Sequence, residues 1–171
     1  MILQGQKVRL RPFTPDDVSA DYLGWLNDAE VVRFSNQRFR RHDQASCLAY
    51  LRSFDGSPNH FLSVRDLDDA PLGTMTAYVS PQHGTADMGI MIGARRAWGQ
   101  GYGLDAWRTL GEWLLAQPGM RKLTGGTLAC NVGMVRIMER AGMQREAVRV
   151  AQELVDGTPQ DIVYYAKFRD A

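Results

Sequence analysis

The chain has 171 residues, of which 44% are hydrophobic and 23% charged, and its formal net charge is +1. This length is enough for one domain with a buried core, and we expect residues 1–171 to form it. So small a net charge favours neither a nucleic acid nor a membrane surface as a partner. No apolar run approaches the roughly 18 residues that a membrane-spanning helix needs.

The cysteines and histidines are few and scattered along the chain. Cys47 and Cys130 cannot build a disulfide framework, and neither has a metal-ligating neighbour at a useful spacing. We therefore expect no metal site. The N-terminal segment lacks the apolar stretch of a signal peptide, and lone cysteines suggest a reducing compartment, so we expect a cytoplasmic protein.

The first third of the chain predicts one strand and two helices. Apolar side chains alternate with arginines over residues 8–12, which indicates a strand. A helix is predicted to start at Thr14, because Pro15 suits the first helical position and Asp17 completes a capping-box pattern. Residues 43–54 form a second amphipathic pattern with helical spacing.

The middle of the chain predicts three strands followed by a long helix. The strands are expected over residues 60–65, 72–79 and 85–92, where apolar runs are separated by turn-forming residues. The helix is expected over residues 104–115, since apolar side chains recur every three or four positions. Pro118 and its following glycine end it.

The C-terminal part predicts a strand, a helix and a closing hairpin. The strand covers residues 122–128, and the helix covers 131–140 and stops before Gly142. The hairpin joins residues 143–154 to 161–168 across a turn rich in turn-forming residues. The predicted order is βααβββαβαββ, an α/β chain.

Residues 96–103 carry three alternating glycines between a strand and a helix. Such a turn can hold phosphate, because glycines clear space and the N–H groups of the first helical turn face the anion. A dinucleotide fingerprint is excluded by Leu104, which stands where a glycine is needed, and the Lys-Ser or Lys-Thr of a P-loop is missing. The remaining pattern, Arg-x-x-Gly-x-Gly from Arg96, also fits a plain glycine-rich loop that caps a helix.

This pattern resembles the diphosphate-binding turn of the GCN5-related N-acetyltransferases, the GNAT family. Residues 8–34 are similar to the start of its ribosomal-protein and amino-sugar branch, and residues 85–93 are similar to its central strand. Residues 131–147 resemble its later helix and turn. Four matches in the right order cover nearly the whole chain. The resemblance implies an α/β fold with a mixed, strongly twisted central sheet flanked by helices.

The resemblance also implies acetyl-CoA as co-substrate, with no metal. In this family, main-chain groups of the central strand hold the pantetheine arm and face the thioester oxygen. The diphosphate rests on the glycine turn, with an arginine as charge partner, and an asparagine side chain contacts the donor. The implied coenzyme-binding residues are Ile90, Met91, Ile92, Arg96, Trp98, Gly99, Gln100, Gly101, Tyr102, Gly103 and Asn131.

Several of these residues have a structural interpretation as well. Residues 90–92 fit a core strand, and both interpretations can hold there, because the backbone binds while the side chains pack. Arg96 fits a solvated surface arginine. Asn131 fits a helix N-cap, a position that asparagine favours.

An ammonium group must lose a proton before it can attack a thioester. Asp87 is the candidate general base, acting through water, because it occupies a central-strand position where family members often carry an acid; the alternative is a strand-edge aspartate with no catalytic role. The tyrosine that commonly protonates the thiolate corresponds to Met138, so that helix offers no general acid there. Tyr164 and Tyr165 are candidate substitutes, with core packing as the alternative.

Residues 33–42 contain four arginines, two phenylalanines and a histidine. In the family, this connection helps to shape the acceptor site, so its charge would suit an anionic acceptor such as a nucleotide-linked amino sugar or an acidic peptide terminus. The alternative is a solvated charge run.

We therefore predict an N-acetyltransferase that moves an acetyl group to a primary amine by direct attack, with a small molecule or amino sugar as acceptor. The alternatives are a protein N-terminal acetyltransferase, a catalytically impaired acyl-CoA-binding module, and a regulator that binds another nucleotide at the turn. The resemblance is compatible with a homodimer, which nothing in the sequence requires.

Overall fold

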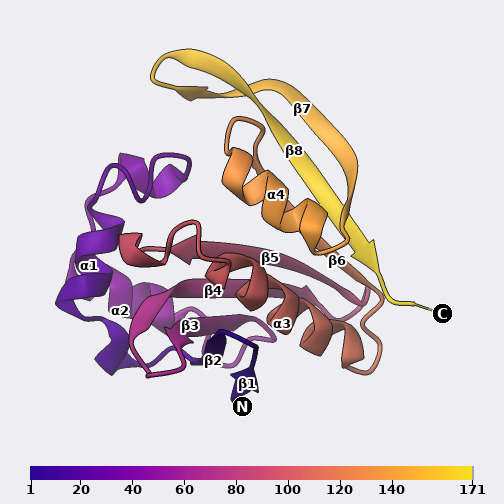
Figure 1. Cartoon of the computed structure of the whole chain (residues 1–171), viewed down its shortest axis with the longest axis horizontal. Coiled ribbons are helices and arrows are strands. Elements are labelled where there is room, and N and C mark those ends of the chain that lie inside the picture. Colours follow the sequence, from indigo (N-terminus) through magenta and orange to yellow (C-terminus); the bar gives the residue numbers. More distant parts are fainter. Residues whose placement is uncertain (171) are drawn as a thin grey trace.

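The computed structural model describes residues 1–170 and is built on one eight-stranded sheet with the strand order β1-β2-β3-β4-β5-β6-β8-β7. Helix α3 packs along one face, and α1 and α2 lie at the other side (Figure 1). The strands are β1 (Leu3–Gln4), β2 (Val8–Pro12), β3 (His60–Asp66), β4 (Pro71–Ser80), β5 (Thr85–Ile92), β6 (Lys122–Leu128), β7 (Gln144–Val155) and β8 (Thr158–Phe168). The helices are α1 (Ala20–Leu26), α2 (Gln44–Arg52), α3 (Tyr102–Ala116) and α4 (Val132–Arg140).

The predicted mixed α/β architecture and its element order are confirmed, with the addition of β1, which at two residues is too short to show a pattern in the sequence. No helix in residues 1–170 is long and apolar enough to cross a membrane.

Strands β5 and β6 run parallel, whereas the other neighbouring strands described in residues 1–170 are antiparallel. Their pairing covers Thr85 with Lys122, Ala86 with Leu123, and Asp87 with Thr124. Beyond Asp87 the two strands part, although β5 remains paired to β4 as far as Ile92. The middle of the sheet therefore has an opening beside the second half of β5.

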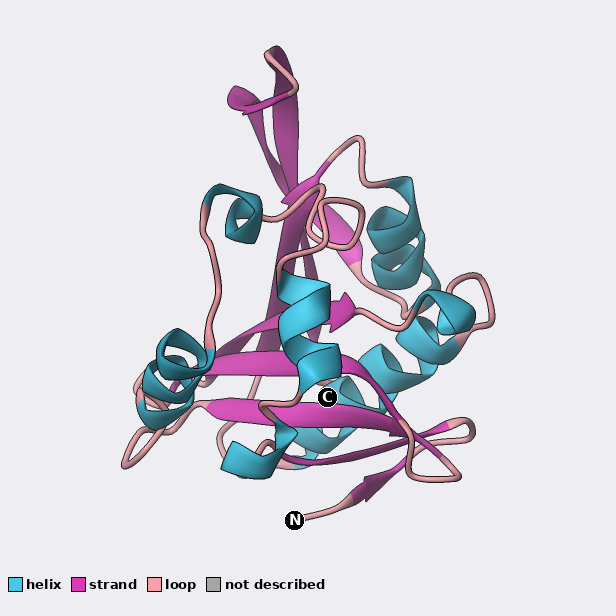
Figure 2. Ribbon diagram, turned by 90° about the vertical axis from the view of Figure 1, so that its left-hand side faces the viewer, coloured by secondary structure: helices cyan, strands magenta, loops and turns pink. Residues whose placement is uncertain are grey.

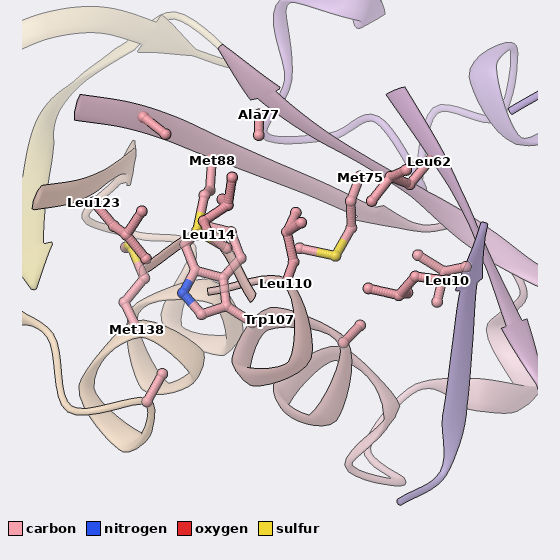
Figure 3. Packing of buried hydrophobic residues seen from close by; sticks show 14 of the residues in the cluster. Leu10, Leu62, Met75, Ala77, Met88, Trp107, Leu110, Leu114, Leu123 and Met138 are labelled. Carbon is pink, nitrogen blue, oxygen red and sulfur yellow. The ribbon is translucent and has the colours of Figure 1, made fainter. Parts of the chain in front are cut away.

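The main core lies between α3 and the sheet. Trp107, Leu110 and Leu114 recur at helical spacing and point at Met75 and Met88 on the strands (Figure 3). These five residues are almost fully buried. Their packing fixes the direction of α3, and so the place where its first turn meets the end of β5.

Met138 joins this core from α4 and is completely buried. It meets Trp107 over Gly125 of β6, where a Cβ would lie 2.9 Å from the indole ring and 3.1 Å from the Met138 sulfur. Gly125 is therefore required by close packing, and Met138 acts as a core side chain.

A second cluster packs on the opposite side of the sheet, beneath α1 and α2. Phe13 stacks on Phe61 with a ring-centroid distance of 4.4 Å, and Val18, Tyr22, Leu26 and Cys47 complete the buried set. This cluster places one face of each of α1 and α2 against the sheet near the opening. It therefore positions the residues that form the second wall of the site described below.

The predicted helix start at Thr14 is wrong. Thr14 caps a single 3-10 turn over Pro15–Asp17, after which Val18 leaves the helical region with φ −76° and ψ 69°. Helix α1 begins at Ala20, and its cap is the hydroxyl of Ser19, which accepts from the N–H of Tyr22. Two ion-pair hydrogen bonds of 2.7 and 2.8 Å tie the Asp17 carboxylate to Arg11 on β2, so the capping pattern fastens a turn to the sheet.

The β7–β8 hairpin projects from the body of the molecule (Figure 2). Its turn is tighter than predicted, because Val155 pairs with Thr158 and leaves two residues, Asp156 and Gly157, in the turn. Both have positive φ, 50° and 78°, as the right-handed twist of a two-residue hairpin favours. The strand predicted to start at residue 161 therefore starts at Thr158.

We expect Gly125→Ala to lower the free energy of unfolding by about 1–3 kcal/mol, because its methyl group would overlap the Trp107 ring in a filled core. Urea unfolding followed by circular dichroism measures this. Gly133→Ala is the matched control, since it lies on α4 with nothing within 4 Å of its Cβ position, and its expected effect is neutral or stabilising. Equal midpoints for the two variants would contradict the packing role of Gly125.

Candidate functional site

The glycine turn connects β5 to α3, and its three glycines are required for different physical reasons. Gly99 and Gly101 have φ of 70° and 84°, a conformation that side chains with a Cβ rarely adopt. At Gly99 nothing lies within 4 Å of a Cβ position, so the turn is open on that face. Gly103 has another role: a Cβ there would lie 3.0 Å from Ile137 on α4, so this glycine allows α3 and α4 to approach.

Gly101 is the N-cap of α3 and has no side chain to cap the helix. The first N–H groups of an α-helix have no partner inside the helix, and the helix dipole adds positive potential there. The turn therefore presents unpartnered donors to any anion that approaches its open face.

Trp98 closes the end of β5. Its indole N–H donates to the carbonyl of Ile92 at 2.8 Å, and the Arg95 guanidinium lies 5.8 Å from the ring centroid. Arg95 in turn pairs with Asp28, beyond the end of α1, at 2.6 Å. These contacts tie the glycine turn to the loop that follows α1.

On the side of the opening, the second half of β5 has no neighbouring strand, although the Ile92 carbonyl accepts from Trp98. The N–H of Gly93 donates to Leu72 on β4 at 2.9 Å, and in an antiparallel pair alternate residues face the partner strand. The amides of Gly93 and Met91 therefore face β4, whereas those of Ile90 and Ile92 face the opening. Three residues were predicted to hold the pantetheine arm through their main chain. The amide of Met91 faces β4 and is used within the sheet, so the amides that face the opening are those of the other two.

A cavity of about 1070 Å³ runs from the glycine turn through this opening to α1 and α2. The predicted coenzyme-binding residues that line it are Ile90, Met91, Ile92, Trp98, Gly99, Gly101, Gly103 and Asn131. Gln100, Tyr102 and Arg96 are not among its lining residues. Most of the predicted donor site thus surrounds one continuous space.

Arg96 points away from this cavity. Its guanidinium pairs with Asp66, at the end of β3, at 3.0 Å, and the side chain is about half exposed. The sequence suggested that the Arg96 charge lies beside the glycine turn. The structure places this charge at Asp66 instead. The local motif identifies the residue but not the direction of a long side chain.

Asn131 is the N-cap of α4, as one interpretation of the sequence has it, and its contact to the donor stays a prediction. Its side-chain oxygen accepts from the N–H of Met134 at 3.5 Å, which makes it a long N-cap bond of α4. Its amide donates to Thr127 at 3.2 Å, and the residue lines the cavity. Because this N-cap hydrogen bond is long, the side-chain amide of Asn131 is able to bind a ligand.

Asp87 is the last residue of β5 that pairs with β6, at the point where the strands part. The Thr124 hydroxyl donates to its carboxylate at 2.7 Å. Although part of the residue faces solvent, burial of the carboxyl group raises the pKa of Asp87, and the bond from Thr124 opposes that rise. Asp87 does not line the cavity, whereas Gly89, two residues further along β5 on the same face, does. The distance between these two residues is about 7 Å along the strand.

The tyrosines of β8 are not among the residues that line the cavity. Tyr165 is buried in the main core, and the Tyr164 ring covers Gly126, where a Cβ would lie 2.9 Å from it. Both fit the packing interpretation. Two other phenols, Tyr22 on α1 and Tyr50 on α2, line the cavity on the side of these helices and were not predicted from the sequence.

The hydroxyl of Tyr50 lies 2.6 Å from that of Tyr78 on β4. Burial raises the pKa of both Tyr22 and Tyr50, so these phenols stay protonated at neutral pH. They are neutral hydrogen-bond donors beside the acceptor space. Only the tertiary fold brings these two residues to a cavity.

The arginine-rich segment 33–42 forms part of the cavity wall and is closed at its base. Asn27 and His42 exchange two hydrogen bonds of 2.8 and 2.9 Å, which join the ends of this loop. Arg38 donates to the carbonyls of Ser35, at 2.7 Å, and of Leu154 on β7, at 2.9 Å. The loop is therefore fastened both to α1 and to the hairpin.

The charge of this wall is mainly positive. Arg33, Arg40 and Arg41 line the cavity together with His42, whereas Glu30 is the one acidic residue lining it in the part of the chain that the structure describes. From the other side, Arg136 and Arg140 of α4 line the donor half. An anion would be attracted into either half.

Residues 7–144 match a family model described as the acetyltransferase (GNAT) domain. No curated protein sequence matches the chain.

Solved structures share the fold along almost the whole chain. RimL, a ribosomal L7/L12 α-N-protein acetyltransferase in complex with coenzyme A, has a TM-score of 0.87 at 16% identity, with 100% of this chain and 99% of that chain covered. A spermidine N-acetyltransferase from Vibrio cholerae, in complex with CoA and spermine, has 0.83 at 16%, with 95% of each chain covered. A GNAT-family acetyltransferase from Bacillus anthracis has 0.84 at 16%, with 100% of each covered.

Proposed function

The chain belongs to the GNAT family of acetyl-CoA-dependent N-acetyltransferases, and we propose that it transfers an acetyl group to the primary amine of a small anionic acceptor. The observation that carries this proposal is the continuous cavity, which joins an anion-binding turn, an open strand edge and a basic wall. Its volume of about 1070 Å³ is large enough for a long donor and a small acceptor together.

The residues present fit acetyl-CoA, which when bound supplies the acetyl group as a thioester. The amides at Gly101 and in the first turn of α3 would hold the diphosphate. The main-chain groups of Ile90 and the N–H of Ile92 would hold the pantetheine amides, since no strand covers them beyond Asp87. An amide N–H of this edge can also donate to the oxygen on which negative charge develops.

Asp87 is proposed to take the proton of the acceptor ammonium. Its carboxylate lies on the same face of β5 as Gly89, which lines the cavity, and more than one water would carry the proton over the roughly 7 Å between the two positions. The free amine then attacks the thioester carbon, the carbon–sulfur bond breaks, and the thiolate leaves. A CoA thiol is a fair leaving group, so the replacement of tyrosine by Met138 does not prevent this step.

The basic wall supports an anionic acceptor. Arg33, Arg40 and Arg41 would repel a polyamine, such as the spermine in the Vibrio cholerae complex, and attract a phosphate or carboxylate group. The loop closed by Asn27 and His42 makes this wall a bounded pocket, which suits a small molecule. A protein N-terminus remains the second candidate, because RimL, with a similar fold, is a protein acetyltransferase.

Thiol release from acetyl-CoA, measured against a panel of amines, tests the function. We expect the order of kcat/KM to be nucleotide-linked or phosphorylated amino sugars, then neutral amino sugars, then spermidine. The best rate with acidic N-terminal peptides would favour the protein acetyltransferase. Thermal stabilisation by CoA without thiol release from any amine would favour a binding module, and stabilisation by ATP or NAD but not by CoA would favour a nucleotide-binding regulator.

The double substitution Arg40→Gln with Arg41→Gln is expected to raise KM for the best anionic acceptor at least tenfold with little change in kcat. The reason is that a hydrogen bond to a charged group contributes about 1.5–3 kcal/mol. Initial rates at saturating acetyl-CoA measure it. Arg52→Gln is the control, since Arg52 is exposed at the end of α2 and does not line the cavity. An unchanged KM in the double variant would show that these arginines do not bind the acceptor.

Gly101→Glu is expected to abolish CoA binding, because it brings a carboxylate and backbone strain to the anion-binding turn. Isothermal titration calorimetry with CoA measures the loss. Gly119→Glu is the matched control, because Gly119 also has a positive φ, 79°, and nothing lies within 4 Å of its Cβ position. The proposal for the turn fails if both variants bind CoA equally well.

The pH dependence of kcat/KM tests Asp87. A base must be deprotonated, so the rate should rise with pH through the pKa of this carboxyl group, which burial places above its ordinary value. Thr124→Val removes the hydrogen bond that stabilises the carboxylate, so the acidic limb should move to higher pH. Asp87→Asn should lower kcat about 100-fold or more with CoA affinity retained. An acidic limb that stays in place in both variants would remove Asp87 from the mechanism.

A further inference from the structure

The segment before β2 is fastened across the start of α3 by one carboxylate. Asp105 accepts the N–H groups of Gln6, Lys7 and Val8 at 3.2, 2.7 and 3.0 Å. Gly5 permits this approach, since a Cβ there would lie 2.5 Å from the Asp105 carboxylate. The backbone of Lys7 is thus held at the helix end that carries the glycine turn.

The Lys7 side chain reaches this turn. Its ammonium group donates to the carbonyl of Gln100 at 2.9 Å and lies 5.7 Å from the centroid of the Tyr102 ring. It is also 3.9 Å from the position that a Cβ of Gly101 would occupy. An ammonium has three donors, and the contact to Gln100 uses one of them.

The other two cations next to the turn are engaged elsewhere. Arg95 pairs with Asp28 at 2.6 Å, and Arg96 pairs with Asp66 at 3.0 Å. Within residues 1–170, Lys7 has no carboxylate partner. Lys7 lines a second cavity, of about 670 Å³, which meets the coenzyme cavity at Gly101 and Leu104, so its ammonium group reaches the glycine turn from the side of the N-terminal segment.

We propose that Lys7 is a coenzyme-binding residue whose ammonium group bridges the Gln100 carbonyl and the diphosphate of CoA. The proposal rests on the proposed function. A lysine binds phosphate as a compact charge, and its charge-assisted hydrogen bonds are stronger than those of neutral donors. Lys7 also offsets the carboxylate of Asp105, which lies in the first turn of α3 and would otherwise repel an anion there.

Calorimetric titration with CoA and with 3′-dephospho-CoA tests this. Lys7→Met keeps the length of the side chain without its charge and should raise Kd about tenfold for both ligands, because both carry the diphosphate. Lys7→Arg should bind nearly as the unmodified protein does. The difference between the unmodified protein and Lys7→Met should shrink as sodium chloride is raised, since salt screens an exposed charge.

Arg9→Met is the control variant, because Arg9 lies two residues further along, on β2, and its guanidinium bonds to Gln4 instead of the turn. It should bind both ligands with unchanged Kd, and all variants should share one urea midpoint. An unchanged Kd in Lys7→Met overturns the proposal, as does an effect confined to CoA, which would assign Lys7 to the 3′-phosphate. If the unmodified protein binds neither ligand, the proposed function itself fails.

Discussion

The parting of β5 and β6 after Asp87 and Thr124 is the constraint on which the site depends. A strand in the middle of a sheet normally uses its main chain on both edges. Here β4 holds one edge of β5 as far as Ile92, and the other edge is open over the last residues. This open edge is where a ligand with amide groups can add to the sheet, beside the Ile92 carbonyl that already accepts from Trp98.

The glycines around this opening show how close packing creates space. Gly125 lets Trp107 and Met138 meet behind β6, and Gly103 lets α3 and α4 converge. Gly99 and Gly101 supply the backbone conformation that turns the chain from β5 into α3. The same residue type thus serves the core in two places and the anion-binding turn in two others.

The charges are divided between fastening the structure and facing the cavity. Arg95 and Arg96 fasten the turn to the loop after α1 and to the end of β3. Arg38 fastens the arginine-rich segment 33–42 to the hairpin through the main-chain carbonyl of Leu154. The arginines that line the cavity have no such carboxylate pairing in residues 1–170, which leaves their charge available to an anionic ligand.

Local pattern predicted much of the fold. The strand Lys122–Leu128 has the predicted bounds, and α3 differs from the prediction by a few residues, because alternation and helical spacing depend on near neighbours. The ends of helices and turns were predicted less accurately. The Thr14 capping pattern is real, but it closes a single 3-10 turn whose Asp17 carboxylate accepts from Arg11 on β2. A helix start predicted from local residues cannot include that partner.

The sequence by itself determined the family and fold, the glycine turn and the position of the central strand, since each of these is written in contiguous residues. The tertiary structure decided which way the long side chains point. It turned Arg96 to Asp66, left Asp87 just outside the cavity, and brought Lys7 to Gln100 from 93 positions away. The reason is that a flexible charged side chain takes its direction from partners distant in the sequence, and only the folded sheet brings those partners within reach.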